Sequence, residues 1–219
     1  MEGARNYNAW LFARCEPYLG GRVLDVGAGI GTFVELAAPG RDVVAVEPDP
    51  AFWPVLAARF GRRSNVKVVR GTADDVVGEF DAILCLNVLE HIRDDRATLR
   101  RFHELLVPGG RLLLLVPAHP TLYGSIDRAL AHERRYSKAE LRERLVEARF
   151  EPETLRLVNP LGAVGWFLAS RVQRSDRVQE GPLLLYDKLV PLLRLVDRVE
   201  WPLGLSVWTV ARRTMTNGG

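Results

Sequence analysis

The stretch VLDVGAGIGTF, residues 23–33, decides the fold, because three glycines follow directly on a run typical of a buried strand. Gly27, Gly29 and Gly31 stand between this run and a helical pattern. Glycine permits a tight turn that brings bare backbone close to a ligand, and the free N–H groups of the following helix attract polar ligand groups. The stretch therefore predicts a strand–turn–helix unit that holds a nucleotide-like ligand.

Short apolar runs alternate with helix-length segments along the chain, which predicts an α/β fold with a parallel sheet covered by helices on both faces. The runs that we expect as strands cover residues 22–26, 42–46, 66–70, 80–86, 111–117, 153–158 and 205–213.

Helix-end signals agree with this division. Asp49 followed by Pro50 predicts a helix start. The apolar face from Leu99 to Leu106 predicts a helix that stops at the following Pro-Gly-Gly. Ser137 and Glu140 have the spacing of a capping box.

With 219 residues, 47% of them apolar, the chain is expected to form one domain, 1–219. We expect an N-terminal helix in 1–19, a cofactor-binding core in 20–118, a substrate loop in 117–137 and a helical insert in 159–204. Residues 183–199 hold ten Leu or Val. The insert could therefore cover the site as a lid, form a homodimer surface, or lie on a membrane.

Composition excludes several classes of protein. The net charge is +3, from 30 basic and 27 acidic residues, which fits a mixed solvated surface and leaves a modest preference for anionic partners open. Cys15 and Cys85 provide no disulfide or zinc framework. No run has the length of a signal peptide or a membrane span, so we expect a cytoplasmic protein.

The acidic residues around the glycines indicate the kind of cofactor. Glu47 ends the second expected strand, 18 residues after Gly29, where an acid can bind ribose hydroxyls. The G-A-G-I-G spacing departs from the G-x-G-x-x-G of nicotinamide dinucleotide sites. Asp25, just before the glycines, suits the ammonium group of S-adenosylmethionine. A nicotinamide oxidoreductase remains an alternative at this point.

These residues make the chain resemble the class I S-adenosylmethionine-dependent methyltransferases. VLDVGAGIGTF is similar to their cofactor loop, VAVEPDP to their ribose-binding strand end, and FDAILCLNVLEHI with LLVPGGRLLLLVP to their fourth and fifth strands. The E-H pair resembles the ubiquinone-biosynthesis type of O-methyltransferase. The resemblance implies a Rossmann-like, seven-stranded, mostly parallel sheet whose last strand lies antiparallel between the fifth and sixth.

The resemblance also assigns cofactor contacts. Glu47 would hold the ribose, Pro48 would lie beside the adenine, and Asn87 would face the methionine tail and the substrate. The family often has G-D-A where this chain has Gly71-Thr72-Ala73, so the adenine contact would pass to Asp74 or to the backbone at Ala73. The expected cofactor-binding residues are Asp25, Gly27, Ala28, Gly29, Glu47, Pro48, Thr72, Ala73, Asp74 and Asn87.

Asn87, Glu90 and His91 share one face at helical spacing. They could hold a divalent metal ion. Alternatively, Glu90 and His91 form a polar brace at the start of the helix after the fourth strand. We take this second alternative as the prediction and therefore expect no metal site.

Catalytic residues are expected in the loop 117–137, because the carboxyl ends of parallel strands form the ligand crevice. His119 and His132 are candidate general bases, and Asp127 could orient His132. Tyr136 could line the substrate site or belong to the core. A further alternative is that Asp127, Arg134 and Arg135 only form an ion-pair network that fixes the loop.

We therefore expect methyl transfer from S-adenosylmethionine to a small-molecule acceptor, most readily at oxygen, with S-adenosylhomocysteine as product. The alternatives are a methyltransferase for a lipid-linked or glycan intermediate at a membrane surface, and a non-catalytic partner protein that keeps the fold. A nucleic-acid substrate is not expected, because the chain has no N-P-P-Y-like tetrapeptide after the fourth strand and no appended RNA-binding module.

Overall fold

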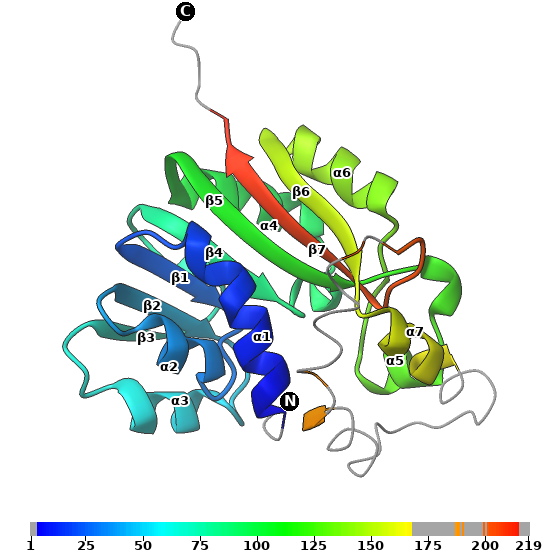
Figure 1. Ribbon diagram of the computed structural model, residues 1–219. Coiled ribbons are helices and arrows are strands. Elements are labelled where there is room, and N and C mark those ends of the chain that lie inside the picture. Colours follow the sequence, from blue (N-terminus) through cyan, green and yellow to red (C-terminus); the bar gives the residue numbers. More distant parts are fainter. Residues whose placement is uncertain (1–3, 168–186, 189, 191–198, 200, 215–219) are drawn as a thin grey trace, which may run out of the picture.

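A seven-stranded sheet forms the centre of the computed structural model, which describes residues 4–167, 187–188, 190, 199 and 201–214 (Figure 1). The strand order is β3-β2-β1-β4-β5-β7-β6. The strands β1 to β5 are parallel, and β7 runs antiparallel to both β5 and β6. The expected Rossmann-like α/β sheet, with its last strand inserted, is therefore confirmed. The strands are β1 Arg22–Val26, β2 Asp42–Glu47, β3 Val66–Arg70, β4 Phe80–Leu86, β5 Leu106–Pro117, β6 Phe150–Val158 and β7 Ser206–Arg213.

Helices cover both faces of the sheet. Alternate residues of β5 show the division: Leu114 packs in one apolar cluster with α4 and α6, and Leu113 packs in the other with α1, α2 and α3. Because the central strands are buried on both faces, their near-continuous apolar runs are required by the packing. The helices are α1 Arg5–Cys15, α2 Thr32–Ala37, α3 Trp53–Phe60, α4 Asp95–Leu105, α5 Ser125–Ala129, α6 Lys138–Glu147 and α7 Pro160–Phe167.

Two expected helix boundaries are wrong. The helix predicted from Asp49 and Pro50 starts at Trp53. Asp49 instead closes a turn in which its carboxylate accepts the Ala51 N–H at 2.7 Å. Leu106 begins β5 and pairs with Phe80 of β4, so the fifth strand starts earlier than its apolar run indicates.

The ends of α6 and α1 are held in different ways. Ser137 caps α6 as expected and accepts the N–H of Glu140 at 3.1 Å, whereas the Glu140 carboxylate pairs with Arg144. The first turn of α1 contains no acidic residue. Its Tyr7 N–H donates at 2.9 Å to Asp187, a buried residue far along the chain.

The expected helical insert, 159–204, is described in part. It begins with α7, while residues 168–186 and most of the leucine-rich run 183–199 lie outside the described residues. Among the helices that the structure describes, none combines the length and apolar character needed to span a bilayer.

Candidate active site

A cavity of about 520 Å³ lies where β1, β2, β3 and β4 end. This is the ligand edge of a doubly wound sheet, and the volume falls in the range of small-molecule sites. The structure brings eight of the ten expected cofactor-binding residues to the wall of this cavity: Gly27, Gly29, Glu47, Pro48, Thr72, Ala73, Asp74 and Asn87.

The turn after β1 lines the cavity with Gly27 and Gly29. Gly27 donates its N–H to the Val46 carbonyl at 2.9 Å, which ties the turn to the end of β2. A Cβ at Gly27 would approach Val88 Cγ2 at 2.5 Å, so this glycine is required by packing. Gly29 also has a positive φ of +56°, but a Cβ there would meet nothing within 4 Å. Gly29 therefore leaves open space on the cavity side, as a close ligand approach requires.

Glu47 is held at the end of β2 by two backbone donors. Its Oε2 accepts the Gly29 N–H at 2.7 Å and its Oε1 accepts the Asp49 N–H at 2.8 Å. Each carboxylate oxygen can accept a second hydrogen bond. Glu47 can therefore join the two loops and still bind hydroxyl groups in the cavity.

Asp25 and Ala28 are the two expected cofactor-binding residues that do not line the cavity, and both are buried. Asp25 Oδ2 has no hydrogen-bond partner among the described residues. Burial, followed by the negative charge of Glu47, raises the pKa of Asp25 to about 8. A cation bound nearby would stabilise the ionised carboxylate and lower this pKa.

Sequence reasoning missed part of the wall. Phe52 is 46% exposed and lines the cavity beside the start of α3. Ile92 and Thr98 reach the cavity from the segment after β4 and from α4. Nothing in a single sequence marks these three residues as cavity residues. His91 also lines the cavity, and its E-H motif was a signal for that position.

A second polar cluster adjoins the cavity at His91. The ligand atoms of Glu90, His91 and His132 lie within 4.8 Å of one another. The expected orientation of His132 is present: its Nδ1 lies 2.9 Å from Asp127 Oδ1. The set of possible metal ligands differs from the expected one. Asn87 lines the cavity, and His132 takes its place beside Glu90 and His91.

Glu90 is the buried member of this cluster. Its Oε2 has no partner within the described part of the chain. Burial raises the pKa of Glu90 to about 8. Burial also lowers the pKa of His91, and the neighbouring His132 adds to the effect. An orphaned carboxylate oxygen, a neutral imidazole and a histidine oriented by a second carboxylate form a donor set that suits a divalent cation.

His119 lies at the end of β5, outside the wall of the cavity, with a positive φ of +58°. The backbone of Gly204 lies beside its ring and raises its pKa, but this effect is smaller than the lowering effects. Its Nε2 is buried and has no hydrogen-bond partner among the described residues. Burial and the Arg135 charge lower the pKa of His119, which keeps the ring neutral.

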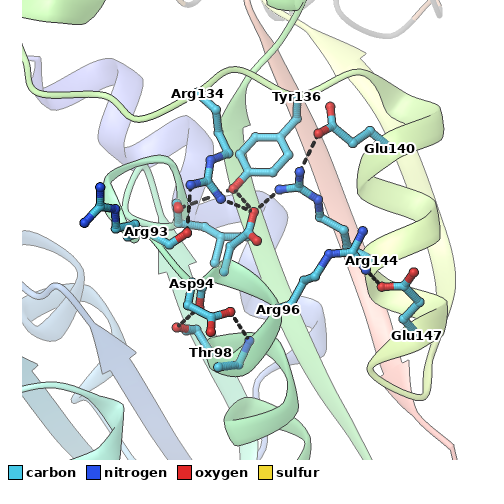
Figure 2. Close-up of polar contacts among 12 residues, drawn as sticks. Arg93, Asp94, Arg96, Thr98, Arg134, Tyr136, Glu140, Arg144 and Glu147 are labelled. Atoms are coloured by element: carbon cyan, nitrogen blue, oxygen red, sulfur yellow. Dashed lines mark hydrogen bonds and ion pairs between the residues drawn. The ribbon is translucent and has the colours of Figure 1, made fainter.

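Tyr136 is fully buried, which favours the core alternative over a substrate contact. Its hydroxyl donates to Asp95 at 2.8 Å, and Arg134 Nη1 lies 2.8 Å from the same carboxylate oxygen. Figure 2 shows these groups and Arg144 converging between α4, α6 and the loop. Burial raises the pKa of Tyr136 far above its usual range, so its hydroxyl stays protonated.

The expected ion-pair network is present but divided. Arg135 pairs with Asp127, with 2.7 Å between Nε and Oδ1, whereas Arg134 pairs with Asp95. The loop is thus fixed at two separate buried carboxylates. None of the four expected catalytic residues lines the cavity: His119, Asp127, His132 and Tyr136. The His132 ring packs edge-on against His91, with 4.8 Å between the ring centroids, and His91 lines the cavity.

A family model described as a methyltransferase domain matches residues 4–157. The chain belongs to this methyltransferase family. The family assignment confirms the resemblance to class I S-adenosylmethionine-dependent methyltransferases that the glycine turn, Glu47 and the E-H motif carry.

Known relatives of this methyltransferase-family chain match it in part. The ubiquinone biosynthesis O-methyltransferase of Xanthomonas axonopodis pv. citri (strain 306) is 39% identical over 112 residues, which cover 48% of this chain and 46% of the relative. The ubiquinone biosynthesis O-methyltransferase of Pseudomonas aeruginosa (strain UCBPP-PA14) is 34% identical over 103 residues, covering 43% of this chain and 44% of that protein. The chain therefore matches less than half the length of these relatives.

Solved structures share the fold over nearly the whole chain. The S-adenosylmethionine-dependent methyltransferase of Mesorhizobium loti has a TM-score of 0.65 at 18% identity, covering 94% of this chain and 98% of that one. Phosphoethanolamine N-methyltransferase 2 of Haemonchus contortus, solved in complex with S-adenosyl-L-methionine, has a TM-score of 0.65 at 20% identity, covering 96% of this chain and 53% of that one.

Proposed function

We propose that the protein transfers a methyl group from S-adenosylmethionine to a hydroxyl oxygen of a small-molecule acceptor, releasing S-adenosylhomocysteine. The observation that carries the proposal is the cavity in which Gly29 leaves its side-chain space open beside the Glu47 carboxylate. The partial relatives are ubiquinone biosynthesis O-methyltransferases, which supports oxygen as the methylated atom.

The cofactor would lie across the ends of β1 and β2. Glu47 would bind the ribose hydroxyls, and Asp25 would ionise to meet the ammonium group. Thr72, Ala73 and Asp74 would contact the adenine. The cavity lining supports these roles for Glu47 and for the three residues after β3.

His119 is the better candidate for the general base. Burial and the charge of Arg135 lower its pKa and favour the neutral ring, and its Nε2 has no hydrogen-bond partner among the described residues, so the ring could accept a proton from a hydroxyl there. His132 Nδ1 is engaged by Asp127, so His132 can act only through Nε2, on the side of Glu90 and His91.

The Glu90, His91 and His132 cluster is the part of the site that could hold a divalent cation. Such an ion would lower the pKa of an acceptor hydroxyl. Asp127 would then orient the ligand His132, an arrangement common around protein-bound metals. Calorimetric titration with Mn²⁺ would test this site. Binding should be lost in His132→Ala and retained in His103→Ala, because the His103 ring packs against Phe150 and does not belong to the cluster.

Calorimetric titration with S-adenosylmethionine and S-adenosylhomocysteine tests the proposed function first, with NAD and NADH as controls. We expect micromolar binding of the first pair, lost in Glu47→Ala and retained in Glu35→Ala, a half-exposed acid on α2 that does not line the cavity. Failure of the folded protein to bind either compound would reject methyl transfer and favour the non-catalytic partner protein.

A lipid-linked or glycan acceptor is the second candidate. Leu161, Trp201 and Leu203 are 52%, 44% and 42% exposed and belong to the two ends of the expected insert. This exposed apolar surface supports peripheral membrane contact, and it would equally serve a homodimer. Flotation with anionic vesicles would detect membrane contact, and analytical sedimentation without vesicles would detect a homodimer. The cytoplasmic location stays a prediction.

A further inference from the structure

Arg135 carries an unused hydrogen-bond donor in the interior of the protein. Its side chain has no exposed surface. Nε donates to Asp127 at 2.7 Å and Nη1 donates to the Ala118 carbonyl at 3.0 Å. Nη2 has no partner among the described residues. A buried donor left without an acceptor is costly, so the unpaired Nη2 is a point at which a ligand oxygen would bind favourably.

An unused acceptor lies in the adjacent segment. The His119 N–H donates to the Tyr136 carbonyl at 3.0 Å, and the Tyr136 N–H donates to the Pro117 carbonyl at 2.9 Å. This pairing sets residues 117–119 beside residues 135–136 at the end of β5. The charge of Arg135 reaches the neighbouring His119 ring and lowers its pKa. His119 Nε2 and Arg135 Nη2 are both buried and both lack a hydrogen-bond partner among the described residues.

Both groups are fixed before any ligand binds. The Arg135 guanidinium lies 4.6 Å from the ring centroid of Trp166 on α7, and Asp127 holds its opposite edge. Asp127 is itself bound by His132 and by the Gly124 N–H at 2.9 Å. A donor held this rigidly stabilises developing charge without reorganisation.

Its neighbour Arg134 does not share these features. Arg134 is paired with Asp95, and its Nη2 donates to the Arg93 carbonyl at 2.8 Å. Arg134 therefore serves the loop, whereas Arg135 has a donor to spare.

We propose that Arg135 is a catalytic residue that binds the acceptor oxygen through Nη2 while His119 Nε2 removes the proton from that oxygen. The inference rests on the proposed methyl transfer and names its acceptor as an ionisable hydroxyl, such as a phenol. As the oxygen lone pair forms the new O–C bond, the C–S bond of the sulfonium breaks and its electron pair stays on sulfur. The hydroxyl proton passes to His119 Nε2 and then to water.

Binding of 4-nitrophenol tests the inference without a known acceptor, because its phenolate absorbs at longer wavelength than the neutral phenol. The probe is titrated into the protein, with and without S-adenosylhomocysteine, about one pH unit below its own pKa. We expect a saturable phenolate band for the unmodified protein. Arg135→Lys, which keeps a cation beside Asp127, should lower phenolate affinity about tenfold.

The matched control is Arg128→Gln, which removes an exposed cation from the same loop region and should leave the band unchanged. If Arg135→Lys does not fold, Trp166→Leu keeps the Arg135–Asp127 pair and should weaken the band. Absence of an Arg135-dependent phenolate band overturns the inference, whether the probe stays neutral or does not bind.

The cofactor titration separates this outcome from failure of the proposed function. Binding of S-adenosylhomocysteine without an Arg135-dependent band rejects the role of Arg135 alone. An Arg135-dependent band in a protein that binds neither S-adenosyl compound rejects methyl transfer and leaves a hydroxyl-binding site.

Discussion

At the residue scale, the open space at Gly29 has a matched control elsewhere in the chain. Gly29 and Gly40 both have positive φ, +56° and +72°, and a Cβ at either would meet nothing within 4 Å. Alanine at either position should therefore cost about 1–2 kcal/mol through backbone strain alone. Only Gly29→Ala should also lower S-adenosylmethionine affinity, by at least about tenfold, as measured by urea unfolding and calorimetry. Equal affinities in the two variants would show that Gly29 does not face the cofactor.

Asp25 should make cofactor binding depend on pH. Because burial and Glu47 raise its pKa to about 8, Asp25 is protonated in the free protein at neutral pH. Binding of an ammonium group favours the ionised form, so affinity for S-adenosylhomocysteine should rise between about pH 6 and pH 7.5, by up to about tenfold per unit. Proton release measured by calorimetry in two buffers checks this. Asp25→Asn should bind weakly and without pH dependence, and a flat wild-type profile would contradict the prediction.

Sequence alone predicted the lining of the cavity better than the contacts of the loop residues 119–136. Gly29 and Glu47 sit next to strand ends, where local pattern fixes their position. Arg135 was expected only as an ion-pair member, because its spare donor depends on the Ala118 carbonyl and on Trp166, which come from other segments. Tyr136 was assigned to the substrate or the core, and only packing shows its burial.

At the element scale, Asp95 joins α4, α6 and the loop through buried contacts, whereas Arg96 and Glu147 join the same two helices at the surface (Figure 2). Tyr136→Phe removes a buried hydroxyl donor to a carboxylate and should lower the free energy of unfolding by about 1.5–3 kcal/mol. Glu147→Gln should cost less than about 1 kcal/mol, because exposed ion pairs contribute little. Urea unfolding measures both, and equal losses would mean that the Asp95 cluster does not hold the loop.

The helices and strands themselves were predictable, but two of their ends were not. The apolar run 111–117 marks the buried half of β5, whereas its start at Leu106 depends on pairing with Phe80 across the sheet. Asp49 has the chemistry of a helix cap, but Glu47 binds its N–H and keeps it in a turn. Tertiary contacts decided both ends.

At the scale of the whole molecule, two buried carboxyls should set the pH dependence of stability. Burial raises the pKa of Asp25 and of Glu90 to about 8, above their values in an unfolded chain. Each contribution to stability is thus fully present below the unfolded pKa and is lost as pH rises toward about 8. Unfolding free energies from about pH 5 to pH 8 should fall, and the double variant Asp25→Asn with Glu90→Gln should flatten the slope. An equally steep slope in that variant would assign it to other groups.

The position of β7 has a consequence for synthesis of the chain on the ribosome. β7 is made after the other strands of the sheet, yet it separates β5 from β6 in the finished sheet. Until they emerge, β6 has no neighbour and β5 has an open apolar edge, and such edges pair readily with other chains. The nascent protein therefore completes its sheet only after residue 213 has emerged, so termination before β7 would yield an aggregation-prone fragment in place of a smaller folded unit.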